Sequence, residues 1–166
     1  MAITRVAVVA AAVGIVAGSA VSVCASPIAA ATPLADGLYR LNFGGTEPAD
    51  FDYPEPRGPY SWLLAIRSAC PPSGCVATAT NVGDSSTTYV FRENGGRYIA
   101  SQTQGFACGG KKTAGISTMS FTVSGESLSG ELVESASPCQ PISRSFTAIR
   151  EGDLPSGVSV ADPDSV

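Results

Sequence analysis

The chain has no histidine among its 166 residues, and this absence removes several kinds of active site. Ser-His and Cys-His couples, a histidine general base and a histidine metal ligand all need an imidazole. A Ser-Lys dyad is not supported either, because neither Lys111 nor Lys112 has a serine three residues before it. The segment GESLS at 125–129 lacks the last glycine of a nucleophile elbow and is predicted to be a turn. We therefore expect no catalytic residue, no cofactor and no enzymatic activity.

Basic residues are also scarce. The formal net charge is −4, the sequence has no basic stripe, and Lys111 and Lys112 are the only adjacent basic pair. Binding to nucleic acid depends on lysines and arginines that neutralise phosphates. The composition thus argues against nucleic acid as a partner, and against an anionic membrane surface.

After the first thirty or so residues, no segment shows a sustained helical period; the pattern alternates with period two instead. Tyr60, Trp62, Leu64 and Ile66 share one face of such a segment, which favours a core position for Trp62 over a ligand platform. The alternating segments, two of them hairpins, are 37–43, 60–68, 75–82, 87–102, 118–135 and 142–150.

These segments predict an all-β domain of about eight antiparallel strands. Since neighbouring strands in sequence tend to be neighbours in space, a small up-and-down barrel is favoured over a Greek-key sandwich. Arg144 and Arg150 in the last strand are expected to point outward or to flank the ends of the sheet.

The N-terminus has the order of a secretory signal peptide. A basic start with Arg5 precedes an uncharged apolar run at 6–23, and Ala29 and Ala31 form an Ala-x-Ala cleavage site. A retained membrane anchor is the alternative, and Cys24 is a poor lipoprotein site because Val23 precedes it. We expect a signal peptide at 1–31, export to the cell envelope or extracellular space, and no stable membrane insertion after cleavage.

Four of the five cysteines follow this leader, an even number that is typical of disulfides in exported domains. Three pairings are possible, and the short Pro-Pro-Ser-Gly turn favours Cys70 with Cys75, which leaves Cys108 with Cys139. A zinc site would need four ligands, usually in close pairs, and Cys108 and Cys139 are not such a pair. We expect two disulfides in a domain at 32–150, followed by a disordered acidic tail at 151–166.

One acidic group deserves comparison with known sites: Glu47, Asp50, Asp52 and Glu55, with Tyr53 among them. Paired carboxylates can catalyse glycosidic hydrolysis, and oxygen ligands can bind calcium, although the spacing matches no EF-hand loop. A solvated loop stiffened by prolines is the favoured interpretation, with a weak calcium site or a carboxylate hydrolase as alternatives. Tyr53 and Trp62 are the candidate ligand contacts.

Several of these features together resemble a known group of proteins. They are Gly37 and Tyr39 in the first strand, Trp62 before SACPPSGCVATA, then Cys108, and LSGELVE before Cys139 and Phe146. The set resembles small exported actinobacterial proteins, found especially in mycobacteria, and a similar domain occurs in extracellular parts of some receptor-type Ser/Thr kinases. The resemblance implies export and a β-rich fold, and it transfers no catalytic residue.

Two classes of function remain open on these grounds. The first is a non-enzymatic module that binds a small apolar ligand or a protein of the envelope or host, and the second is the hydrolase that uses the 47–55 carboxylates.

Overall fold

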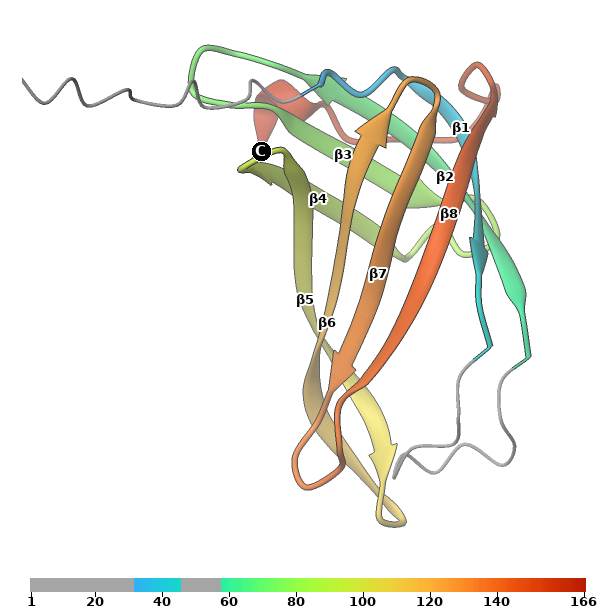
Figure 1. The fold of residues 1–166 in the computed structure, drawn as a ribbon, viewed down its shortest axis with the longest axis vertical. Helices are drawn as coiled ribbons and strands as arrows, with labels where there is room; N and C mark the ends of the chain where they lie inside the picture. Colours follow the sequence, from blue (N-terminus) through green and yellow to red (C-terminus); the bar gives the residue numbers. More distant parts are fainter. Residues whose placement is uncertain (1–31, 46–57) are drawn as a thin grey trace, which may run out of the picture.

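The computed structural model describes residues 32–45 and 58–166, and these form one antiparallel β-barrel (Figure 1). The strands follow each other around the barrel in chain order, and β8 returns to pair with β1. The predicted all-β, up-and-down barrel is confirmed. Its strands are β1 (Gly37–Phe43), β2 (Tyr60–Ala69), β3 (Val76–Asn81), β4 (Thr88–Asn94), β5 (Arg97–Cys108), β6 (Lys111–Ser124), β7 (Ser127–Ser135) and β8 (Ile142–Gly152).

Period-two alternation explains why these segments form a barrel. On β1, Tyr39, Leu41 and Phe43 are buried, while the residues between them are more exposed. Leu41 lies opposite Trp62 on β2 and opposite Ala148 on β8. Because β1 is paired on both sides, its backbone polar groups are satisfied and its apolar side chains fill the interior.

Aromatic rings occupy much of that interior. The ring of Phe121 lies 4.9 Å from Phe91 and 5.4 Å from Tyr98, measured between centroids, and Tyr89 lies 5.7 Å from Phe91. All four of these side chains are buried, so this part of the barrel is a packed core rather than a hollow one.

The hairpin of β5 and β6 is longer than the sequence predicts. The expected strands end at 102 and resume at 118, whereas β5 continues to Cys108 and β6 begins at Lys111. The turn between them is Gly109–Gly110, with φ angles of 62° and 73° that only glycine adopts readily. Most of the intervening residues are small or polar, and Phe106 and Ile116 are the only large apolar ones among them, so the segment lacks the regular apolar alternation by which the other strands are recognised.

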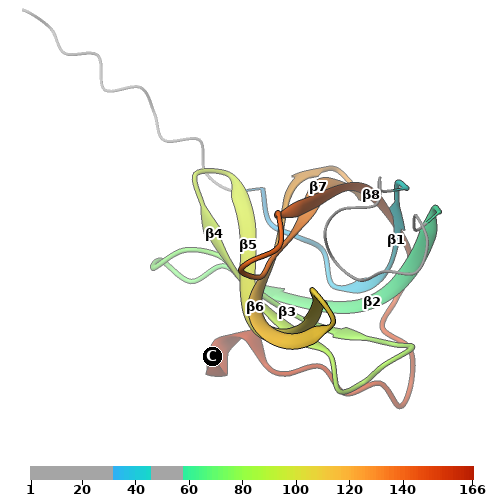
Figure 2. The same cartoon turned by 90° about the horizontal axis from the view of Figure 1, so that it is seen from below.

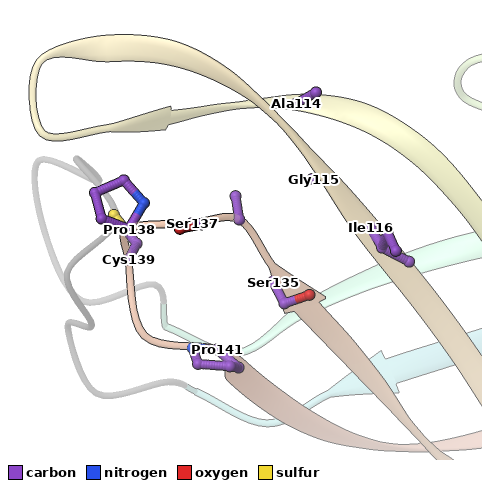
Figure 3. Close-up of a pocket in the computed structure, with 9 residues that line it drawn as sticks. Ala114, Gly115, Ile116, Ser135, Ser137, Pro138, Cys139 and Pro141 are labelled. Carbon is purple, nitrogen blue, oxygen red and sulfur yellow. The ribbon is translucent and has the colours of Figure 1, made fainter.

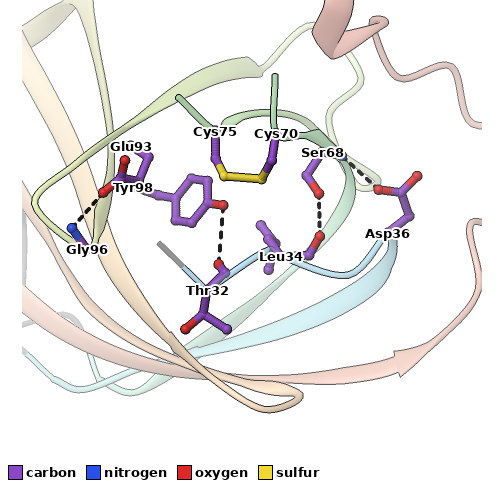
Figure 4. The surroundings of a disulfide bond; sticks show 9 residues. All are labelled: Thr32, Leu34, Asp36, Ser68, Cys70, Cys75, Glu93, Gly96 and Tyr98. Atoms are coloured by element: carbon purple, nitrogen blue, oxygen red, sulfur yellow. Dashed lines mark hydrogen bonds between the residues drawn. A yellow bond between two sulfur atoms is a disulfide. The ribbon is translucent and has the colours of Figure 1, made fainter. Parts of the chain in front are cut away.

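Residues 32–36 close one end of the barrel next to the first disulfide (Figure 4). Leu34 is buried, and its carbonyl accepts a hydrogen bond from the Ser68 hydroxyl. The Ser68 amide donates to Oδ1 of Asp36 at 2.7 Å, and Tyr98 OH donates to the carbonyl of Thr32 at 3.4 Å. Cys70 and Cys75 are bonded beside this segment, between the end of β2 and the start of β3.

The C-terminal segment differs from the expected disordered tail. Strand β8 runs to Gly152, and the chain then crosses the outside of β3, where the hydroxyls of Thr78 and Thr80 donate to the carbonyls of Ala161 and Ser159 at 2.6 and 3.0 Å. A short 3-10 helix, η1 (Pro163–Ser165), ends it with Pro163 buried. We name residues 153–166 the strap. Outward-facing threonines on β3 supply the donors that a search for apolar patterns overlooks.

Candidate functional site

The structure describes only some of the site residues that the sequence predicts. Glu47, Asp50, Asp52, Tyr53 and Glu55 lie outside the described residues, as does the proposed leader at 1–31. The calcium, hydrolase and Tyr53 hypotheses therefore stay predictions.

Trp62 is half-buried and belongs to an aromatic cluster at the end of the barrel opposite Leu34. Its ring lies 4.8 Å from Phe43, edge to face, and 5.8 Å from Tyr60. Phe43 also stacks on Tyr60 at 4.7 Å and meets Phe146 at 5.2 Å. The indole thus packs against the core, while its remaining exposure leaves contact with a ligand as a prediction.

The barrel interior also holds a charged pair that sequence reasoning missed. Arg144 is 2% exposed, and its guanidinium donates a hydrogen bond to Oε2 of Glu134, which is 8% exposed. This corrects the expectation that Arg144 points outward or flanks the sheet. Its place between Ile142 and Phe146 in an alternating strand was the available signal, because both of those neighbours face inward.

Arg150, in contrast, lies at the barrel end as expected. Its guanidinium donates to the carbonyl of Asp36 at 3.0 Å and to Asp153 at 2.7 Å.

The environment of Glu134 is suited to structure rather than to acid–base chemistry. Gln104 donates to its second carboxylate oxygen at 3.4 Å, and the guanidinium of Arg144 balances its charge. Glycosidic hydrolysis needs two carboxyl groups facing each other. Within 32–45 and 58–166, Glu134 is the only buried carboxylate, so this region does not supply such a pair in its interior.

Burial raises the pKa of three tyrosines. For Tyr89 the rise reaches about 12, caused mainly by burial and then by the negative charge of Glu134. The pKa of Tyr39 and of Tyr98 is also raised, chiefly by burial. These phenols therefore stay protonated near neutral pH, and two of them donate hydrogen bonds: Tyr39 OH to the carbonyl of Ala35 at 2.8 Å and Tyr98 OH to that of Thr32 at 3.4 Å.

A groove of about 430 Å³ lies on the surface beside the second disulfide (Figure 3). It runs between the β5–β6 hairpin and the connection from β7 to β8. Ile116 projects from β6 with 52% of its surface exposed, so an apolar side chain is presented to solvent here. Among the described residues, those that line the groove carry no charge: they are Ala114, Gly115, Ile116, Ser135, Ala136, Ser137, Pro138, Cys139 and Pro141.

Close packing and a covalent bond fix the walls of this groove. A Cβ atom on Gly115 would collide with the carbonyl oxygen of Ser135 and would lie 2.6 Å from Cβ of Ala136. Cys108 and Cys139 are bonded, which joins the end of β5 to the far wall. Beneath them, Phe106, Ala136 and Ile142 form a small second core. The groove is therefore a largely preformed concavity whose described walls carry no charge, the type of surface that takes up apolar groups.

Both disulfides are thus the pairs that the spacing favoured: Cys70 with Cys75, and Cys108 with Cys139. The groove itself had no sequence signal, because its two walls come from segments about twenty residues apart in the chain and share no motif.

Two kinds of feature are absent from the described segments. In residues 32–45 and 58–166 no helix has the length and apolar character to cross a membrane. Over the same part of the chain, no three Cys, Asp or Glu side chains gather as a metal-binding group.

Comparison with known proteins agrees with this fold. The monomer form of the M. tuberculosis PknI sensor domain is a solved structure with a TM-score of 0.62 and 24% sequence identity, and the match covers 81% of this chain and 99% of that one. At this identity the likeness shows the fold. No curated protein matches the chain.

A family model matches nearly all of the described domain. It is that of the PknI serine/threonine-protein kinase sensor domain, and it covers residues 32–165. The resemblance to mycobacterial β-rich proteins and to a receptor-kinase extracellular domain is confirmed, and the matched family is a sensor rather than a catalytic domain. The chain therefore belongs to the PknI serine/threonine-protein kinase sensor domain family.

Proposed function

We propose that this protein is an exported, non-enzymatic sensing domain that binds a ligand or a partner protein at the groove beside Cys108 and Cys139. The observation that carries the proposal is the exposed Ile116 in a groove whose walls are fixed by the disulfide and by Gly115. A sensor must present a surface that recognises something, and exposed apolar patches in preformed concavities commonly serve this purpose.

Two further features support a surface site and not an interior one. Aromatic rings pack against each other inside the barrel, and the interior charge of Glu134 is already balanced by Arg144. A ligand entering there would have to displace well-packed side chains, which costs several kcal/mol, on the order of 2–5 for one large residue. The groove requires no such displacement.

The groove hypothesis can be tested with small apolar probes observed by NMR. We expect isopropanol and phenol to shift the amide resonances of 114–116 and 135–139 in the natural protein. Replacing Ile116 with serine should remove most of this response. Ile149 offers a matched control, because it is 59% exposed on β8 and lies away from the groove. Ile149→Ser should leave the shifts unchanged; equal losses in both variants would contradict a site at the groove.

Export is the second part of the proposal. The family match begins at residue 32, directly after the Ala29-x-Ala31 cleavage pattern, and this supports removal of the leader. Protein recovered outside the cytoplasm should have an N-terminal sequence that begins near Thr32. Recovery only in membranes, with residues 1–23 still attached, would favour a retained anchor instead.

A further inference from the structure

Strand β5 has an open edge along part of its length. It pairs with β6 from Tyr98 to Cys108, but β4 pairs with it only at 97–99. Figure 1 shows β5 separating from β4 and running on beside β6. Among the described residues, therefore, no strand lies against the β4 side of Ser101–Gly105. We name this segment the β5 edge.

The β5 edge presents peptide groups to solvent. In an antiparallel pair, every second residue directs both its N–H and its C=O away from the partner strand. Ser101, Thr103, Gln104 and Gly105 are all exposed, and the register with β6 is continuous through them. Backbone donors and acceptors in this arrangement match those of an incoming extended chain.

This edge also lacks the features that usually prevent strand pairing. Proteins protect exposed edges with prolines, bulges or charged side chains on the strand itself. The segment SQTQG contains no proline and no charge, and no bulge interrupts its pairing with β6. In the part of the chain that the structure describes, the β5 edge is thus regular and no other strand covers it.

Charge beside the edge indicates what kind of strand fits. The protein has a net charge of −4, yet the hairpin from Arg97 to Ser124 contains Arg97, Lys111 and Lys112 and no acidic residue. Lys112 and Gly105 lie together, since a Cβ atom on Gly105 would sit 2.5 Å from Cε of Lys112. The aliphatic part of the lysine side chain therefore reaches from β6 to lie over β5 at Gly105, which brings a positive charge close to the β5 edge. Glycine at 105 leaves room for it.

We propose that the β5 edge accepts an extended, acidic segment of another polypeptide, which adds as a strand while Lys112 pairs with its carboxylates. Backbone hydrogen bonds supply the alignment, and the lysine selects for negative charge. This site is separate from the groove, so the proposal does not depend on ligand binding there.

The test uses a short synthetic peptide in which threonine alternates with glutamate, with both ends blocked. In the free protein, the outward amides of the β5 edge should exchange rapidly with solvent. Added peptide should slow exchange at alternate residues of Ser101–Gly105, and more salt should weaken the effect because the ion pair is exposed. A peptide with lysine in place of glutamate should give no protection.

A second peptide separates strand addition from simple charge attraction. N-methylation of every second amide keeps all glutamates but removes the donors that face β5, so protection should be lost. In the protein, Lys112→Gln should weaken binding by about two- to fivefold, the range expected for an exposed ion pair. Arg67→Gln on β2 is the matched control and should leave the affinity unchanged.

A proline substitution completes the design. Proline is placed at Thr103 or Gln104, whichever amide exchanges rapidly, because it removes an outward donor and spares the ladder with β6. The proline variant should keep the native NMR spectrum and no longer bind the acidic peptide. If this variant fails to fold, the N-methylated peptide still tests whether the peptide adds as a strand. Three results would each overturn the proposal. The N-methylated peptide could bind as well as the unmodified one, or the amides of the β5 edge could exchange slowly with solvent in the free protein. Protection of these amides could also depend only on protein concentration.

Discussion

Arg144 and Glu134 face each other inside the barrel and join β8 to β7 through a hydrogen-bonded ion pair. The side chain of Arg144 is 1% exposed and that of Glu134 is 10% exposed. A buried pair of this kind adds little net stability compared with apolar residues, but each charge depends on the other. Neither charged side chain can therefore be replaced alone by an apolar one without leaving the other charge buried and unbalanced.

Replacing Arg144 with methionine should destabilise the protein by about 3–5 kcal/mol, because it leaves the Glu134 carboxylate buried without its partner. Urea unfolding measures this change. Arg40→Met is the control, since Arg40 pairs with Glu151 at the surface, and its cost should stay within about 1 kcal/mol. The double change Arg144→Met with Glu134→Leu should recover much of the loss. Equal costs for the two single variants would contradict the interior role.

High pH should weaken the fold through Tyr89. Burial and the Glu134 charge raise the pKa of Tyr89 from 10.0 to about 12 in the folded protein. The unfolded chain therefore releases this proton first, so the stabilising contribution is complete below pH 10 and is lost as pH rises toward 12. The free energy of unfolding should fall by up to about 2–3 kcal/mol across this interval.

Tyr89→Phe tests the assignment, because phenylalanine keeps the ring and removes the titrating group. Urea unfolding at a series of alkaline pH values should give a shallower decline for the variant than for the natural protein. Some decline should remain, since burial also raises the pKa of Tyr39 and Tyr98. Identical pH dependences would show that Tyr89 titrates normally.

Features that depend on a local sequence pattern could be predicted, whereas features that depend on contacts between strands could not. Alternation revealed the strands because each is half-buried, and the Pro-Pro-Ser-Gly turn identified Cys70 with Cys75. The interior position of Arg144 was missed because a charge was assumed to face water, although its own strand period placed it inside. Such an exception depends on Glu134, whose proximity arises only from the pairing of β7 with β8.

Three features arise from contacts between segments that are distant in the chain, so no sequence pattern predicts them. The groove exists because Gly115 and Ala136 approach across β6 and the β7–β8 connection. The open β5 edge exists because β4 ends its pairing at Ile99. The strap is held by threonine hydroxyls whose acceptors lie about eighty residues later. None of these relationships has a local signature.

The strap offers its own test. Changing Thr78 and Thr80 together to valine removes two hydroxyl donors and keeps the side-chain shape, so about 1–3 kcal/mol should be lost if both bonds stabilise the fold. Backbone amides of 158–164 should exchange faster in this variant. Thr122→Val is the control, because its exposed hydroxyl donates at 3.4 Å to a neighbouring strand and not to the strap. Unchanged exchange in the strap would mean that contacts other than these two hydrogen bonds, such as the burial of Pro163, retain it.

Gly130 provides the sharpest steric prediction. Its side-chain position points into the core between β6 and β8. A Cβ atom there would overlap the carbonyl oxygen of Ser120 and would lie 2.7 Å from Cβ of Phe121 and 2.8 Å from Cζ of Phe146. The Ser120 carbonyl and the Phe121 Cβ are held by the backbone and cannot rotate away, so β6 and β7 must separate to admit even one methyl group.

Gly130→Ala should therefore lower the free energy of unfolding by at least about 1–3 kcal/mol, the usual cost of overpacking, and more if the ladder between β6 and β7 breaks. Gly58→Ala is the matched control, because a Cβ there meets nothing within 4 Å. It should change stability by no more than about 0.5 kcal/mol. Chemical denaturation of both variants distinguishes the outcomes: if Gly130→Ala unfolds at the same urea concentration as Gly58→Ala, the close approach of Phe146 and β6 to this residue is wrong.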